Sequence, residues 1–169
     1  MTRVIFVCLG NICRSPMAEA VFQHLVDAAG LTGQFQVESR GTGAWHVGEP
    51  AHPGTQRVLA KRGIAYQGCA QHLEPHDLDD PQTYVVVMDS ENWREVQRRF
   101  GDVPRLHRLL EFAGRTQARD VPDPFYTGAF EQVYALVEEG CRGLLAAIRA
   151  EEGVQRLGKA DGNAMRSGL

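Results

Sequence analysis

Residues 8–16, with the sequence CLGNICRSP, constrain the fold and chemistry of this chain more than any other stretch. They follow the apolar run 4–7, which is typical of a buried strand, and precede residues 17–22, which favour a helix. Gly10 and Asn11 tolerate left-handed backbone, so the turn can point several N–H groups inward around an anion. Ser15 is a favoured N-cap, and Pro16 suits a first helical position. The sequence therefore predicts an anion site, suited to phosphate, at a helix N-terminus.

Cys8 and Arg14 give this turn the pattern Cys-x5-Arg. A helix N-terminus and a nearby arginine favour the thiolate form of a cysteine, which is its nucleophilic form. Arg14 offers a planar fork that matches two phosphoryl oxygens, and the Ser15 hydroxyl can hydrogen-bond the thiolate. An isolated cysteine is more often an inert buried residue, but the strand, turn and helix around Cys8 favour catalysis. The pattern predicts nucleophilic phosphoryl transfer.

The size and charge of the chain restrict the classes of partner. It has 169 residues, a length typical of one domain, and a net charge of −3 without a basic stripe, which argues against nucleic acid. Its four cysteines show neither zinc-binding spacing nor a disulfide framework, which favours a cytoplasmic protein with active thiols. No stretch has the roughly 18 apolar residues of a membrane span, so no membrane partner is expected.

Residues 7–20, VCLGNICRSPMAEA, resemble the signature of the low-molecular-weight protein-tyrosine phosphatases. The resemblance implies that Cys8 is the nucleophile, that Arg14 clamps the phosphate, and that Cys13 is a second thiol able to form a reversible disulfide with Cys8. It also implies that Ser39 hydrogen-bonds Asn11 and that Trp45 forms a wall of the substrate cleft. The remaining residues expected at the phosphate and substrate site are Leu9, Gly10, Asn11, Ile12, Cys13, Ser15 and Tyr126.

Asp123 is the expected general acid. Pro124 keeps Asp123 in extended backbone, outside any helix, so that its carboxylate is presented from a loop. The run Asp-Pro-Phe-Tyr matches the family's acid motif, although many relatives have tyrosine where this chain has Phe125. Asp89, which follows another predicted strand and can cap the next helix, is a minor alternative for the acid. Asp123 would protonate the leaving phenolic oxygen and then activate water.

The predicted fold is a single α/β domain over residues 1–150, followed by a polar C-terminal tail at 151–169. Its four-stranded parallel sheet has the order 2-1-3-4, with helices on both faces and the phosphate-binding loop after the first strand. The expected strands are 3–8, 35–39, 84–88 and 105–110, the second near an edge and the third central. The expected helices end at 29 and span 54–62, 92–100 and 129–150, the last with Cys141 on its apolar stripe.

One segment departs from the family pattern. Relatives usually carry a histidine and an arginine where this chain has Gly68 and Gln71. These two side chains normally support the phosphate-binding loop from behind. The sequence leaves open what replaces them, whether His72 takes part, and whether Cys69 has a role.

The predicted function is hydrolysis of phosphotyrosine in proteins, and of small aryl phosphates, through a cysteinyl-phosphate intermediate. Inorganic phosphate is the product, no metal or cofactor is expected, and the protein is expected to be a monomer or a weak dimer. An arsenate reductase of the same fold would need a closely spaced downstream cysteine pair, whereas Cys69 and Cys141 are far apart. A protein-arginine phosphatase typically has a small polar residue where Ile12 stands. A thiol redox sensor or phosphate-binding module would not need Asp123.

Overall fold

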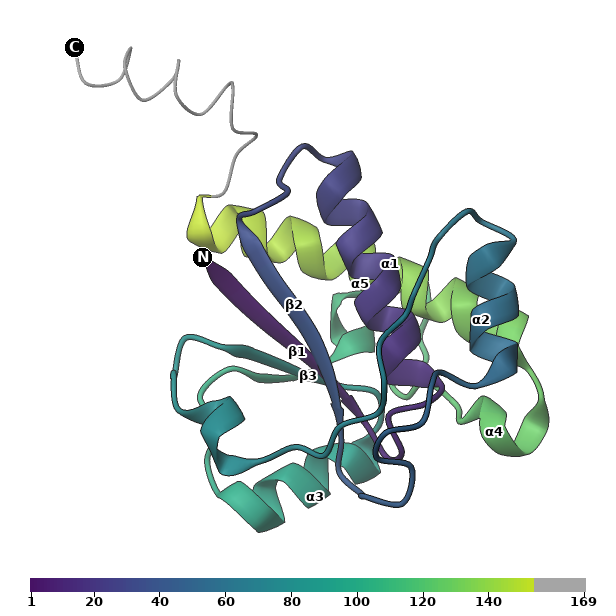
Figure 1. Cartoon of the computed structure of the whole chain (residues 1–169). Helices are drawn as coiled ribbons and strands as arrows, with labels where there is room; N and C mark the ends of the chain where they lie inside the picture. Colours follow the sequence, from purple (N-terminus) through teal and green to yellow (C-terminus); the bar gives the residue numbers. More distant parts are fainter. Residues whose placement is uncertain (154–169) are drawn as a thin grey trace.

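A four-stranded parallel sheet organises the chain. The computed structural model describes residues 1–153, and Figure 1 shows the arrangement of their helices and strands. The strands lie in the order β2 (Phe35–Gly41), β1 (Thr2–Cys8), β3 (Tyr84–Val87) and β4 (Leu106–Arg108). The predicted order 2-1-3-4 is confirmed, with β2 at an edge and β3 in the interior of the sheet. β1 is therefore paired on both sides, and its carboxyl end at Cys8 lies where parallel α/β sheets bind ligands.

Helices cover both faces of the sheet, as predicted. On one face, Val4 and Phe6 of β1 belong to the core that α1 (Arg14–Ala28), α2 (Pro53–Ala60) and α5 (Phe130–Glu152) help to build. On the other face, Ile5 and Val7 pack in a second core with Val96 of α3 (Ser90–Phe100). The apolar run of β1 is thus buried on both sides, which explains its lack of polar alternation.

The first helix begins earlier than the sequence suggested. Cys13 is the N-cap of α1 and makes no side-chain cap, so the prediction of Ser15 as N-cap is wrong. Ser15 lies in the first turn, where its hydroxyl turns toward Cys8 instead of capping the helix. Pro16 is tolerated as the third residue of the helix because the first N–H groups of a helix have no intrahelical partner.

The observed fold differs from the predicted one in several short elements. Strand β4 is only three residues long, because Leu109 and Leu110 leave the sheet to be buried in the core. They begin a 3-10 helix, η2 (Leu109–Phe112). Sequence patterns also missed η1 (Pro75–Leu78) and α4 (Pro124–Thr127), both of which have a proline in the first turn. Helix α3 starts at Ser90, and Asp89 caps it as expected, accepting from the Asn92 N–H.

The last helix ends slightly beyond its predicted boundary. α5 continues to Glu152, so the first two residues assigned to the tail belong to the helix. The rest of that segment, residues 154–169, lies outside the described residues. Cys141 is fully buried on the apolar side of α5, which confirms its assignment to the core. Within the described part of the chain, no helix is both long and apolar enough to cross a membrane.

Candidate active site

The turn between β1 and α1 has the conformation expected of an anion-binding loop. Asn11 has a positive φ of 57°, as its residue type allows. A Cβ at position 10 would lie 2.9 Å from Cδ2 of His46, so any residue larger than Gly10 would require the His46 ring to shift. The first N–H groups of α1 carry no side-chain cap and remain available to an anion. These are features that we expect of an anion-binding loop.

Cys8 lies at the bottom of this loop. Its residue is only 3% exposed, and its Sγ atom is 3.0 Å from Oγ of Ser15. The second thiol, Cys13, is also buried, and this burial together with the nearby charge of Cys8 raises the pKa of Cys13 to about 12. Both thiols are free, as is that of the exposed Cys69. The loop thus holds two buried thiols, Cys8 and Cys13.

Arg14 is anchored from behind by two other segments. Its Nη1 atom donates to Oδ2 of Asp89 at 2.6 Å and to the carbonyl oxygen of Val121 at 2.9 Å. Burial lowers the pKa of Arg14, but the charges of Cys8, Asp89 and Asp123 outweigh it and raise the pKa overall. Its Nε atom is buried with no hydrogen-bond partner within residues 1–153. Arg14 therefore stays charged and retains an N–H donor for a ligand oxygen.

Asp123 lies at the same site, although it is more than 100 residues from Cys8 in the sequence. It is the N-cap of α4, and its Oδ1 atom accepts a hydrogen bond of 3.0 Å from the Phe125 N–H. This cap orients the carboxylate, and Oδ2 lies 3.6 Å from Nη2 of Arg14. Asp123 itself is outside the helix and in extended backbone, as Pro124 led us to expect.

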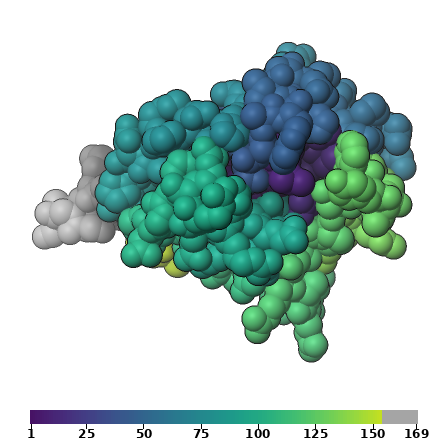
Figure 2. All heavy atoms as spheres, turned by 90° about the horizontal axis from the view of Figure 1, so that it is seen from below, coloured from purple at the N-terminus to yellow at the C-terminus, as the bar shows by residue number. Residues whose placement is uncertain are grey.

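A cavity of about 310 Å³ joins these groups. In Figure 2, purple atoms of the N-terminal segment lie in a hollow between the blue segment that follows β2 and the green segment near α4. Trp45 and Tyr126 stand at the rim, 71% and 78% exposed. Sequence reasoning missed His46 and Phe125, which flank those two aromatic residues in the chain and could have been found by that adjacency. The cavity is lined by Cys8, Leu9, Gly10, Ile12, Cys13, Arg14, Trp45, His46, Asp123, Phe125 and Tyr126.

The remaining predicted residues lie behind the loop. Oγ of Ser39 accepts from Nδ2 of Asn11 at 3.0 Å, the contact that the resemblance implied. The backbone N–H of Gln71 donates to Oδ1 of Asn11 at 2.9 Å, so position 71 supports the loop through its main chain. His72 bonds Glu74 and the carbonyl oxygen of Thr42, one layer further from Cys8. Among the described residues, no group of three or more His, Cys, Asp or Glu side chains could hold a metal ion.

Comparisons with known proteins agree on one family. The model of the family described as low molecular weight phosphotyrosine protein phosphatase matches residues 3–155. The chain is 45% identical over 155 residues to the low molecular weight protein-tyrosine-phosphatase YfkJ of Bacillus subtilis, which covers 90% of this chain and 99% of the relative. It is 44% identical over 150 residues to the corresponding phosphatase PtpA of Staphylococcus epidermidis, covering 88% and 94%.

Solved structures give the same result. The crystal structure of YfkJ superposes with a TM-score of 0.85 over 89% of this chain and 96% of that one. The crystal structure of the Drosophila arginine phosphatase is also similar, with a TM-score of 0.79 and 28% identity, covering 88% and 98%. Since a family model matches almost the whole chain and close relatives share its fold over nearly their full length, the chain belongs to the low molecular weight phosphotyrosine protein phosphatase family.

Proposed function

We propose that Cys8, Arg14 and Asp123 carry out the hydrolysis of phosphotyrosine in proteins and of small aryl phosphates. One observation carries this assignment: a thiol, a guanidinium and a carboxylate from three distant parts of the chain line one cavity with an aromatic rim. A nucleophile, a phosphate clamp and an acid are the groups that a metal-independent phosphoryl transfer needs.

In the first step, the Cys8 thiolate attacks phosphorus in line with the leaving oxygen. The loop N–H groups and Arg14 hold the equatorial oxygens, whose charge grows in the transition state. Asp123 gives its proton to the phenolic oxygen as the P–O bond breaks. The products are a free phenol and a cysteinyl phosphate, and Asp123 is left as a carboxylate.

In the second step, water replaces the sulfur. The Asp123 carboxylate takes a proton from the attacking water, so that the acid is restored for the next turnover. The S–P bond breaks, inorganic phosphate is released, and Cys8 returns to its thiolate form. The Ser15 hydroxyl, whose Oγ atom is 3.0 Å from the sulfur, can donate a hydrogen bond to the sulfur as it leaves phosphorus.

The shape of the cavity supports an aromatic phosphate as the substrate. Ile12, buried at the bottom, offers an apolar surface, and Trp45, Phe125 and Tyr126 border the opening. Contacts of a substrate ring with such side chains are worth about 0.5–1.5 kcal/mol beyond the area that they bury. An apolar wall of this kind suits a phenyl ring better than the charged guanidinium of phosphoarginine.

Peptides of one sequence test this preference. The peptide carries phosphotyrosine, phosphoserine or phosphoarginine at a single position, and phosphate release is measured with the wild-type chain and with Cys8→Ser as the blank. We expect turnover of the phosphotyrosine peptide far above the other two. Faster release from phosphoarginine would assign the site to arginine phosphatase chemistry, which the similar Drosophila structure makes the natural second candidate.

We further propose that Cys13 is the redox partner of Cys8. A peroxide would oxidise the Cys8 thiolate to a sulfenic acid, and the Cys13 sulfur would then displace its hydroxyl group, which leaves as water. The two residues are close enough for the charge of Cys8 to raise the pKa of Cys13. Such a disulfide would protect the nucleophile from further oxidation.

The remaining proposals concern the setting in which the enzyme works. We propose a catalytic domain at residues 1–150 that acts on phosphotyrosine proteins in the cytoplasm, as a monomer or weak dimer. Free thiols at Cys8, Cys13, Cys69 and Cys141 suit a reducing compartment. The positive charge of Arg14 and the loop N–H groups supply the stabilisation for which other phosphatases use a metal.

A further inference from the structure

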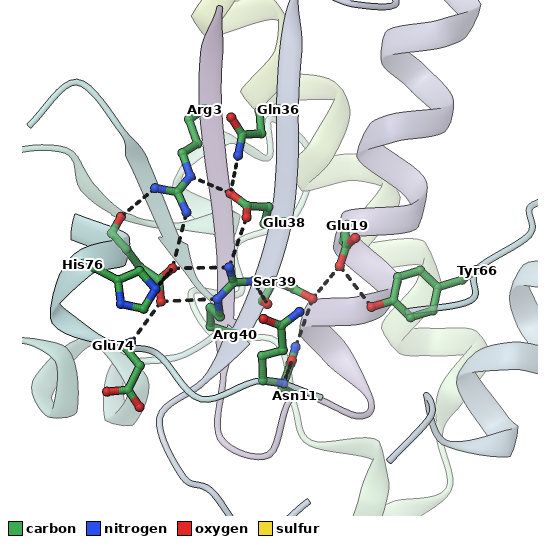
Figure 3. A network of polar contacts seen from close by, with 12 residues as sticks. Arg3, Asn11, Glu19, Gln36, Glu38, Ser39, Arg40, Tyr66, Glu74 and His76 are labelled. Atoms are coloured by element: carbon green, nitrogen blue, oxygen red, sulfur yellow. Dashed lines mark hydrogen bonds and ion pairs between the residues drawn. The ribbon is translucent and has the colours of Figure 1, made fainter. Parts of the chain in front are cut away.

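A chain of hydrogen bonds connects the nucleophile to a tyrosine on a different segment. It runs from Cys8 through Ser15, Asn11 and Ser39 to Glu19, whose carboxylate is also bonded by the hydroxyl of Tyr66. Figure 3 shows the outer part, in which the Tyr66 and Ser39 hydroxyls meet at the Glu19 carboxylate and Asn11 lies below Ser39. The successive distances are 3.0 Å from Cys8 to Ser15, 2.7 Å from Ser15 to Asn11, 3.0 Å from Asn11 to Ser39, 2.6 Å from Ser39 to Glu19, and 3.0 Å from Glu19 to Tyr66.

The outer end of this chain sets the direction of its hydrogen bonds. Oε1 of Glu19 accepts from both the Ser39 and the Tyr66 hydroxyls. Ser39 has one hydroxyl hydrogen, which Glu19 receives, so Oγ of Ser39 acts as the acceptor toward Nδ2 of Asn11. The amide of Asn11 is thereby oriented, with its oxygen toward the Gln71 N–H. Each link thus constrains the next one inward.

The inner end delivers a donor to the nucleophile. The second Nδ2 hydrogen of Asn11 goes to Oγ of Ser15, which therefore keeps its own hydrogen for another acceptor. Two acceptors are in reach, the Cys8 sulfur at 3.0 Å and the carbonyl oxygen of Arg40 at 3.4 Å. A charged sulfur is the stronger acceptor, so the Ser15 hydroxyl points to Cys8 when Cys8 is a thiolate.

Tyr66 occupies the space that a side chain at position 68 would need. A Cβ atom built on Gly68 would lie 2.3 Å from the hydroxyl oxygen of Tyr66 and 2.6 Å from its Cζ atom. Gly68 is not among the glycines with positive φ, so its backbone permits other residues. The glycine is therefore required by the position of Tyr66. A histidine at this position would meet the Tyr66 ring, which accounts for the glycine.

We propose that Tyr66 is a positioning residue for the cysteinyl-phosphate reaction, acting through Glu19, Ser39 and Asn11 on the Ser15 hydroxyl. The inference rests on the proposed function and deepens it. Tyr66 does not line the cavity and does not touch the substrate. It stabilises the arrangement in which sulfur receives a hydrogen bond as it leaves phosphorus in the second step.

The protonation of the outer pair agrees with this role. Burial raises the pKa of Tyr66, and the charge of Glu19 raises it further, so the hydroxyl keeps its hydrogen and remains a donor. Burial also raises the pKa of Glu19, although the hydrogen bonds from Ser39 and Tyr66 act against it. Removing the Tyr66 hydroxyl therefore weakens the support of a carboxylate that is already costly to bury.

The test compares two tyrosine variants by steady-state and burst kinetics with p-nitrophenyl phosphate. Tyr66→Phe removes the hydroxyl bonded to Glu19. Tyr84→Phe is the matched control, because its hydroxyl also bonds a glutamate, Glu152, at 3.0 Å, but at the start of β3 and away from the loop. We expect Tyr66→Phe to lower kcat about threefold to tenfold, the effect of one hydrogen bond. We expect kcat/KM and the inhibition constant of inorganic phosphate to stay unchanged, with a larger burst.

A second arm tests the link between Tyr66 and Gly68. Gly68→Ala pushes a methyl group into the Tyr66 hydroxyl and should reproduce the kcat loss of Tyr66→Phe. In a Tyr66→Ala background the same substitution has space, so Gly68→Ala should add no further loss. Equal losses in both backgrounds would show that Gly68 acts independently of Tyr66 and would overturn the proposal.

The outcomes separate this inference from the proposed function. If the wild-type chain does not release p-nitrophenol, the proposed function fails. If the wild type is active and Tyr66→Phe has the same kcat, the positioning role of Tyr66 alone is overturned. A loss of equal size in Tyr84→Phe, or a weaker affinity for phosphate in Tyr66→Phe, would show a general loosening of the structure and would also overturn it.

Discussion

Nη2 of Arg14 lies 3.6 Å from Oδ2 of Asp123, so the candidate phosphate clamp and the candidate acid meet on one side of the cavity. Asp89 contacts the same guanidinium through Nη1 at 2.6 Å but does not line the cavity around Cys8. This difference in position separates the roles of the two aspartates. Asp89 holds Arg14 in place, whereas Asp123 lines the cavity, which is the position that our proposal requires of the acid.

Replacement of Asp123 by Asn should slow the step in which the leaving group departs. We expect kcat/KM, which reports the first step, to fall by about 10²–10⁴-fold for phenyl phosphate, because a poor leaving group needs the proton most. The loss should be smaller for p-nitrophenyl phosphate, whose leaving group is stable as an anion. Asp102→Asn, on an exposed turn after α3, is the control. Equal losses on both substrates would contradict the role of Asp123 as an acid.

Replacement of Arg14 by Lys keeps the charge but removes the planar fork. Its Nε atom, buried and unpartnered within the described chain, has no counterpart in lysine. We expect kcat/KM to fall by about 10²–10³-fold, as when one preorganised donor is removed. Phosphate affinity, measured by calorimetry, should fall as well. Phosphate binding as tight as in the wild type would show that Arg14 is not the clamp.

The loop and its two partners were the parts of the site that sequence could predict. Cys8 and Arg14 are separated by five residues in one turn, where local residue types determine the conformation, and Asp123 belongs to a recognisable motif. The sheet order 2-1-3-4 was predicted as well. The first residue of α1 was harder to predict, because Pro16 is compatible with more than one position in the first turn of a helix.

Contacts between distant side chains could not be predicted. Tyr66 bonds Glu19 because the segment after α2 passes beside α1, and no local pattern records that placement. Likewise, β4 is short because Leu109 and Leu110 are buried outside the sheet. Their position is determined by packing against α5, which is distant in the sequence. The departure at Gly68 was visible in the sequence, but its explanation required the position of the Tyr66 ring.

The four thiols should differ sharply in reactivity. We expect iodoacetamide at neutral pH to label Cys8 and the exposed Cys69, and to leave Cys13 and Cys141 unmodified in the native protein. The pKa of Cys13, raised to about 12 by burial and by the charge of Cys8, keeps it a thiol at neutral pH. Peptide mass spectrometry identifies which cysteines carry the label.

Two controls accompany the labelling. Inorganic phosphate should protect Cys8 and not Cys69, and unfolding in urea should expose all four thiols. Labelling of Cys13 in the native protein at the rate of Cys69 would contradict the burial of Cys13 seen in the structure.

Asp77 should make stability depend on acidity. Its side chain is 1% exposed and lies within 3.3 Å of the guanidinium groups of Arg3 and Arg40. Burial raises the pKa of Asp77, but the Glu74 N–H and Arg40 outweigh it, so the pKa is lowered overall. Because the folded-state pKa is lower than the unfolded one, this stabilisation is present above the unfolded pKa and is lost as pH falls through the folded value.

Urea unfolding of Asp77→Asn tests this dependence. At neutral pH we expect the variant to lose about 2 kcal/mol of unfolding free energy, since the buried Arg40 and the half-buried Arg3 each lose a charged hydrogen-bond partner and keep Glu38. The difference from the wild type should shrink as pH falls through the lowered folded-state pKa of Asp77, where the wild-type carboxylate becomes protonated. Asp79→Asn, exposed and two residues away, is the matched control. A difference that is the same at every pH would contradict the ion-pair account.

The most direct test of the account is turnover of a phosphotyrosine peptide by Cys8→Ser, measured together with the binding of inorganic phosphate to the same protein. The serine hydroxyl is a far weaker nucleophile than a thiolate, while the loop N–H groups and Arg14 remain in place. We predict no turnover above the uncatalysed rate and phosphate affinity close to that of the wild type. Retained turnover would contradict Cys8 as the nucleophile and, with it, the cysteinyl-phosphate mechanism.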